Sequence, residues 1–156
     1  MSVDVPPGDE LRELYRELIL DHARSPRHFG KLHTATHKAS GINPLCGDKL
    51  TLYFELDADA KISDARFEGS GCAISVASAS LLTDTVVGMN LQAAKALFTA
   101  VTDSLSGKTG LVSADLGKLR ALLGVKEFPS RVKCATLAWH AMNAALLKED
   151  TQVSTE

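Results

Sequence analysis

Hydrophobic residues recur with two different periods along the chain. Between residues 11 and 19 they follow the three- and four-residue spacing of an amphipathic helix, which ends before Pro26. Between residues 50 and 56 they alternate with polar residues, as in a half-buried strand. A polar turn at 57–61 and a second alternation at 65–68 complete a predicted hairpin.

The pattern changes after the hairpin. Residues 72–82 are small and apolar on all sides, which indicates a closely packed, buried helix. Further helices are predicted at 91–105, at 115–123 and at 130–147, the last one capped by Ser130. Strands followed by helices predict an α+β fold, with a small antiparallel sheet of about three strands covered on one face by helices.

The length of 156 residues suits one domain. We expect a flexible N-terminal arm at 1–10, a single domain at 11–149 and a flexible tail at 150–156. A net charge of -2 without a basic cluster argues against a nucleic-acid partner. The apolar runs are shorter than the roughly 18 residues that span a membrane, and the start of the chain has no signal pattern, so a cytoplasmic protein without a membrane partner is expected.

The chain has three cysteines. An odd number with wide spacing fits a reduced compartment better than a disulfide framework. Composition alone leaves open whether they are buried thiols, a catalytic thiol or metal ligands.

The first candidate site is the turn at 43–48, Asn-Pro-Leu-Cys-Gly-Asp. Its Pro and Gly constrain the backbone around Cys46. Cys46 and Asp48 are two residues apart, so in an extended segment they face the same side and could converge on one ion. The alternative is an ordinary turn with an incidental cysteine.

Two further cysteines stand at predicted helix starts. Cys72 follows a glycine-rich strand exit, where a helix N-terminus would stabilise a thiolate, although a small buried residue would also fit there. Arg131 lies three residues before Cys134, so the two are neighbours on a helix surface. A guanidinium there could offset the charge of about -2 of a zinc site with three thiolates and one carboxylate, or it could be a solvated charge.

A Cys-His catalytic pair is not favoured. His140 follows Cys134 by six residues, which places the two side chains about 120° apart around a helix. The remaining histidines are predicted to be surface or structural residues. They are His22, His28, His33 and His37.

The turn at 43–48, the Gly71-Cys72 pair and Cys134 at the start of a long helix resemble the IscU/NifU-like family over residues 14–147. The segments 14–16 and 21–27 are also similar to this family.

Three departures resemble the SufU-type members rather than the cluster-building ones. Lys133 stands where cluster-building members have a His, and a Leu-Pro-Pro-Val-Lys stretch is replaced by residues 128–133. The segment between Cys72 and Cys134 is also longer, with extra residues at about 107–124.

The resemblance implies one Zn²⁺ per chain, with Cys46, Asp48, Cys72 and Cys134 as its ligands. It further implies a sulfurtransferase that takes persulfide sulfur onto Cys46 from a SufS-type, PLP-dependent cysteine desulfurase, for downstream iron–sulfur cluster assembly proteins. Arg131 would keep the charge balance while ligands change. We expect Cys46 to be reachable on its turn, and the other two cysteines to be shielded by small apolar neighbours.

Two alternatives remain open. An iron–sulfur cluster scaffold of the IscU type would use the same four positions to hold a cluster. A non-catalytic binding module would use zinc only to stabilise its fold.

Overall fold

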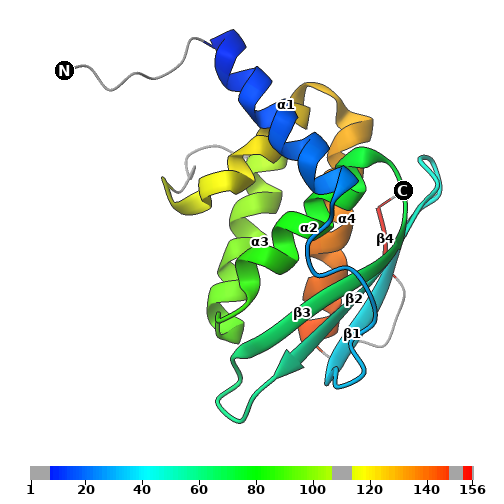
Figure 1. The fold of residues 1–156 in the computed structure, drawn as a ribbon, viewed down its shortest axis with the longest axis vertical. Coiled ribbons are helices and arrows are strands. Elements are labelled where there is room, and N and C mark those ends of the chain that lie inside the picture. The colour runs from blue at the N-terminus through cyan, green and yellow to red at the C-terminus, as the bar shows by residue number, and fades with distance from the viewer. Residues whose placement is uncertain (1–7, 107–113, 148–152, 156) are drawn as a thin grey trace.

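A computed structural model of the protein describes residues 8–106, 114–147 and 153–155. The elements follow the order helix, three strands, then helices (Figure 1). They are α1 (Gly8–Arg24), β1 (His37–Asn43), β2 (Asp48–Leu56), β3 (Ile62–Ser70), α2 (Ala73–Val86), α3 (Leu91–Leu105), the 3-10 helix η1 (Ala114–Glu127), α4 (Pro129–Leu146) and β4 (Val153–Ser154). The described residues contain no helix that is both long and apolar enough to cross a membrane.

The sheet has four strands in the order β3-β2-β1-β4. Strands β1, β2 and β3 form an antiparallel meander, and β4 lies parallel to β1. The predicted α+β class is therefore confirmed. The short β4 differs from the prediction, because it lies in the tail that was expected to be flexible. The edge of β1 has main-chain groups that need hydrogen-bond partners, and β4 supplies them, as in the bond from Thr155 N to Ile42 O at 3.1 Å.

Helices cover one face of the sheet (Figure 1). Helix α4 packs on β1 and β2, and α2 packs on β3 and on α4. Alternate side chains of β2, including Leu50, Leu52 and Phe54, are fully buried in this layer. The core therefore lies between the sheet and the α2–α4 pair.

Small side chains allow α2 and α4 to approach closely, and buried polar groups fix their register. Ser75 donates to the carbonyl of Cys134 at 3.2 Å, and Ser78 donates to the carbonyl of Ala135 at 2.6 Å. The indole Nε1 of Trp139 donates to Ser78 at 3.0 Å. These bonds fix the start of α4, including Cys134, against α2.

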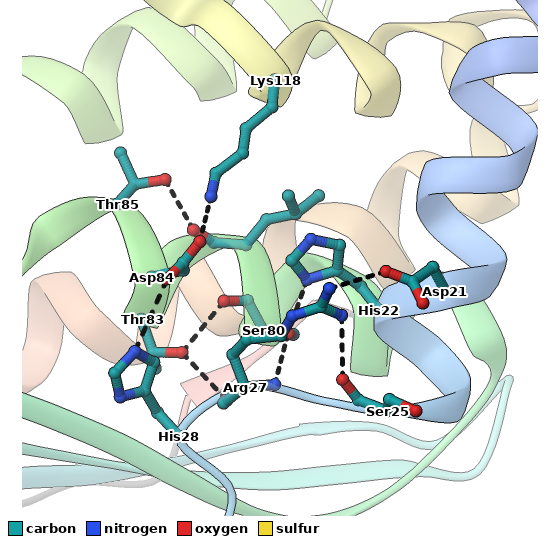
Figure 2. Close-up of polar contacts among 11 residues, drawn as sticks. Asp21, His22, Ser25, Arg27, His28, Ser80, Thr83, Asp84, Thr85 and Lys118 are labelled. Atoms are coloured by element: carbon teal, nitrogen blue, oxygen red, sulfur yellow. Dashed lines mark hydrogen bonds and ion pairs between the residues drawn. The ribbon is translucent and has the colours of Figure 1, made fainter.

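A polar cluster holds the end of α1 against α2 (Figure 2). The buried His22 and the hydroxyl of Ser80 lie 2.7 Å apart, and Arg27 N donates to the same hydroxyl at 2.8 Å. Asp84 on α2 forms an ion pair with Lys118 of η1. The segment 21–27 thus has a structural role in docking α1.

Three further features differ from the predicted elements. Helix α4 begins at Pro129, and its N-cap is Phe128 without a side-chain bond, so the predicted Ser130 cap is wrong: Pro129 occupies the first turn and leaves Ser130 inside the helix. The helix predicted at 115–123 is the 3-10 segment η1, broken at Gly117 by its positive φ of 55°. The predicted arm shortens, because α1 already begins at Gly8, and residues 1–7 lie outside the described part.

Candidate metal centre

Three elements that are distant in sequence meet at one end of the molecule. They are the turn between β1 and β2, the N-terminus of α2 and the first turns of α4. Each brings one predicted cysteine. The turn also brings Asp48, which is the first residue of β2 and pairs with Asn43 across the hairpin.

Cys46 lies in a tight turn with few restraints. Its N–H donates to the carbonyl of Asn43 at 3.2 Å, and Gly47 has a φ of 70°, a left-handed conformation that glycine adopts without strain. Cys46 is half-buried, and the preceding Leu45 is 69% exposed. Cys46 is therefore partly accessible, and it lies on a hairpin turn outside the helices.

Asp48 is the oxygen donor of the group. Its side chain is buried, at 2% exposure, and Oδ1 accepts a hydrogen bond from the backbone N–H of Cys72 at 2.8 Å. A Cβ added at Gly71 would lie 2.5 Å from the same oxygen, so only glycine leaves room for this carboxylate. Oδ2 lies 4.0 Å from the Cys72 thiol. Gly71 and Cys72 together hold Asp48 toward the other donors.

Cys134 is the buried sulfur of the site. Its Sγ lies 3.1 Å from Sγ of Cys46, well beyond a disulfide bond of about 2.05 Å, and all three cysteines are free thiols. The side-chain amide of Asn43 donates to Cys134 Sγ at 3.6 Å. Burial raises the pKa of the Cys134 thiol, and its contacts with Cys46, Asp48 and Cys72 raise it further.

The donor set fits a thiolate-binding metal. The donor atoms of Cys46, Asp48 and Cys134 all lie within 4.8 Å of one another. Cys72 stands beside this trio, next to Asp48. Within the described residues no cationic side chain pairs with the buried Asp48, so a metal ion would supply the missing positive charge. Three sulfurs and one carboxylate are a suitable set for tetrahedral Zn²⁺.

The structure changes one expectation about the cysteines. Cys72 is half-buried like Cys46, and its neighbours Gly71 and Ala73 are exposed, so the expected shielding of Cys72 is wrong. The reason is that Cys72 is the N-cap of α2, where the chain leaves the sheet at the surface. Cys134 is buried, as expected. Exposure alone therefore does not separate Cys46 from Cys72.

Arg131 and His140 lie outside the donor group. Arg131 is exposed in the first turn of α4, and the described residues show no hydrogen bond or ion pair of its side chain, so its role stays a prediction. His140 packs edge-on against Phe98, with ring centroids 5.3 Å apart. Sequence reasoning did not assign a role to Asn43 or Gly71, although both stand within three residues of a predicted ligand.

Comparisons with known proteins show the family of the chain. The family model for the NifU-like N terminal domain matches residues 14–135. The zinc-dependent sulfurtransferase SufU of Bacillus subtilis is 42% identical over 140 residues, covering 90% of this chain and 94% of the relative. The iron–sulfur cluster assembly scaffold protein IscU of Streptococcus pyogenes is 39% identical over 137 residues, covering 88% and 85%.

A solved structure shows the same fold. It is a protein from Fervidobacterium islandicum assigned as an iron–sulfur cluster assembly scaffold for the SUF system, with a TM-score of 0.79 and 36% identity, covering 86% of this chain and 98% of the other. The resemblance to IscU/NifU-like proteins of the SufU type is thereby confirmed. The chain belongs to the NifU-like N-terminal domain family.

Proposed function

We propose that this protein is a zinc-dependent sulfur acceptor in iron–sulfur cluster assembly, taking persulfide sulfur from a SufS-type cysteine desulfurase onto Cys46. The observation that carries the proposal is the convergence of Cys46, Asp48 and Cys134 within 4.8 Å, with Cys72 beside them. The name of the B. subtilis relative supports both the zinc and the sulfur transfer.

Zinc held by Cys46, Asp48, Cys72 and Cys134 would keep the three cysteine ligands deprotonated at neutral pH. A free cysteine, with a pKa of about 8.5, is mostly protonated there. The site needs this, because burial raises the pKa of Cys134. A donor set that joins a hairpin turn, α2 and α4 would also cross-link the fold.

Cys46 is the proposed acceptor because its surroundings differ from those of the other two cysteines. The described backbone hydrogen bonds of its turn are local, from Cys46 N to Asn43 O and from Gly47 N to Pro44 O. Cys72 caps α2 and anchors Asp48, and Cys134 lies inside α4. Cys46 can therefore turn outward while the other donors stay in place.

The transfer of sulfur between the two proteins needs no further oxidant or reductant. The Cys46 thiolate attacks the outer sulfur of the desulfurase persulfide, so that a new sulfur–sulfur bond forms on Cys46 while the one in the desulfurase breaks. The desulfurase leaves as a thiolate, and the proton stays on the transferred sulfur. The exposed Arg131, one turn before Cys134, would offset negative charge during the exchange.

The proposal is tested by metal analysis together with desulfurase stimulation. We expect about one zinc per chain, and we expect Cys46→Ser to stop stimulating sulfide release from the desulfurase and cysteine while remaining folded. Cys72→Ser is the matched control for a lost zinc ligand, and it should lose more zinc than Cys46→Ser. Full stimulation by Cys46→Ser, or a chain without zinc, would contradict the proposal.

A second candidate function is an iron–sulfur cluster scaffold. Several relatives carry that name, and the same donors could hold a cluster. Anaerobic purification distinguishes the two functions, because a scaffold would yield a brown, iron-loaded protein. A non-catalytic zinc-stabilised module would instead bind zinc and accept no sulfur on any cysteine.

A further inference from the structure

Asn43 is a buried polar residue inside the candidate metal centre. It is the last residue of β1, and its side chain is fully buried, at 0% exposure. Its Nδ2 donates to Cys134 Sγ at 3.6 Å, while Oδ1 is buried without a partner among the described residues. Placing an amide there costs free energy that an apolar side chain would avoid, so a role beyond packing is indicated.

The bond from Asn43 goes to only one of the three sulfurs. The described side-chain contacts of Cys46 and Cys72 are with Cys134 and with Asp48, and neither thiol accepts an amide N–H in the described residues. An N–H donor withdraws electron density from a metal-bound thiolate, which makes that sulfur a weaker nucleophile, and the same bond holds the side chain in place beside the metal. The three sulfurs are therefore chemically unequal before any partner arrives.

We propose that Asn43 is a positioning residue whose hydrogen bond keeps Cys134 as the permanent metal ligand and leaves Cys46 as the exchangeable one. The inference rests on the proposed zinc-dependent function, and it adds a reason why Cys46 rather than Cys134 accepts the transferred sulfur. Asn43 is well placed for this role because its carbonyl also accepts the N–H of Cys46 at 3.2 Å. One residue thus shapes the turn of the exchangeable cysteine and holds the sulfur of the fixed one.

The test uses the full chain loaded with Zn²⁺ or, separately, with Co²⁺. Asn43→Ala removes the donor, and Asn43→Leu removes it while keeping a similar volume, so agreement between them separates the hydrogen bond from packing. Ser75→Ala is the matched control, since Ser75 is equally buried and donates to the carbonyl of Cys134 rather than to its sulfur. Circular dichroism of the metal-free proteins identifies the variants that fold.

Two readouts are independent of sulfur transfer. In chelator competition, both Asn43 variants should bind zinc about 10- to 100-fold more weakly, whereas Ser75→Ala should stay within about threefold of wild type. In the Co²⁺-substituted protein, the sulfur-to-metal charge-transfer band should move to lower energy in the Asn43 variants only, because a thiolate without its donor gives up an electron more easily.

The outcomes distinguish this inference from the proposed function. A wild-type chain that takes up no zinc overturns both. A wild-type chain that binds zinc, with Asn43 variants that match Ser75→Ala in affinity, overturns the role of Asn43 alone. Weaker binding without a shift of the Co²⁺ band would show that Asn43 only packs the site, and it would overturn the inference as well.

Discussion

Gly71→Ala should weaken the metal centre through a single steric contact. The added Cβ would lie 2.5 Å from Asp48 Oδ1, and 3.1 and 3.2 Å from Cγ and Cβ of the same side chain. Ordinary contacts begin at 3.4 Å, so the carboxylate oxygen must move by about 0.9 Å. The φ of Gly71 is not in the left-handed region that favours glycine, so the steric contact with Asp48 is the expected cause of the effect.

That movement removes the bond that orients Asp48. The hydrogen bond from Cys72 N to Oδ1 is 2.8 Å long, and a shift of that size takes it out of hydrogen-bonding range. A hydrogen bond to a charged group contributes about 1.5–3 kcal/mol to stability. If the loss is expressed in metal binding, zinc affinity should fall by about 10- to 150-fold.

Competition with a chromophoric zinc chelator measures this directly. Gly124→Ala serves as the control, because an added Cβ there meets nothing within 4 Å, and its zinc affinity should stay within about twofold of wild type. If Gly71→Ala bound zinc as tightly as wild type, the steric reasoning and the assignment of Asp48 as a ligand would both be wrong.

Three further predictions concern the ligands, the charge balance and pH. Cys134→Ala should lose zinc and lower the melting temperature together, measured by elemental analysis and calorimetry, and unchanged zinc would reject Cys134 as a ligand. Arg131→Ala should slow sulfur transfer more than it lowers zinc content, with Lys133→Ala as the neighbouring charge control; normal transfer would show that Arg131 is only a surface charge. Burial lowers the pKa of His22 in the folded protein. Below the ordinary value of about 6.5 the unfolded chain therefore binds more protons than the folded chain, and stability should decrease as the pH is lowered. In urea unfolding of metal-free protein, His22→Gln should show a smaller loss between pH 7.5 and 5.5, and an equal loss would exclude His22 as a source.

The hydrophobic pattern was sufficient to predict a strand or helix where apolar side chains alternate or recur with a clear period. The strand at 50–56 and the helix at 91–105 match β2 and α3 because their periodicity reflects one buried face. Strand β1 gave no such signal. Its sequence His-Lys-Ala-Ser-Gly-Ile-Asn is rich in small and polar residues, and Gly41 sits against Leu137 of α4, where an added Cβ would lie 2.9 Å from Leu137 Cδ1.

The convergence of Cys46, Asp48 and Cys134 was predictable from the sequence, whereas the contacts that support these residues were not. Cys46 and Asp48 share a short motif, but Asn43 contacts Cys134 on α4, and Gly71, which precedes α2, lies against Asp48 at the start of β2. Contacts between segments distant in sequence are fixed by tertiary packing, which periodicity does not report. The same limit explains the expected shielding of Cys72, since the exposure of the N-terminus of α2 depends on how that helix leaves the sheet.

The most direct test of the central claim is the site of the transferred sulfur. The zinc-loaded protein is incubated with a SufS-type cysteine desulfurase and cysteine, its thiols are alkylated, and the added sulfur is located by peptide mass spectrometry. We predict one additional sulfur atom on the peptide that contains Cys46 and little on those that contain Cys72 or Cys134. Sulfur mainly on Cys72, which is half-buried like Cys46, or on the buried Cys134 would contradict the proposed acceptor.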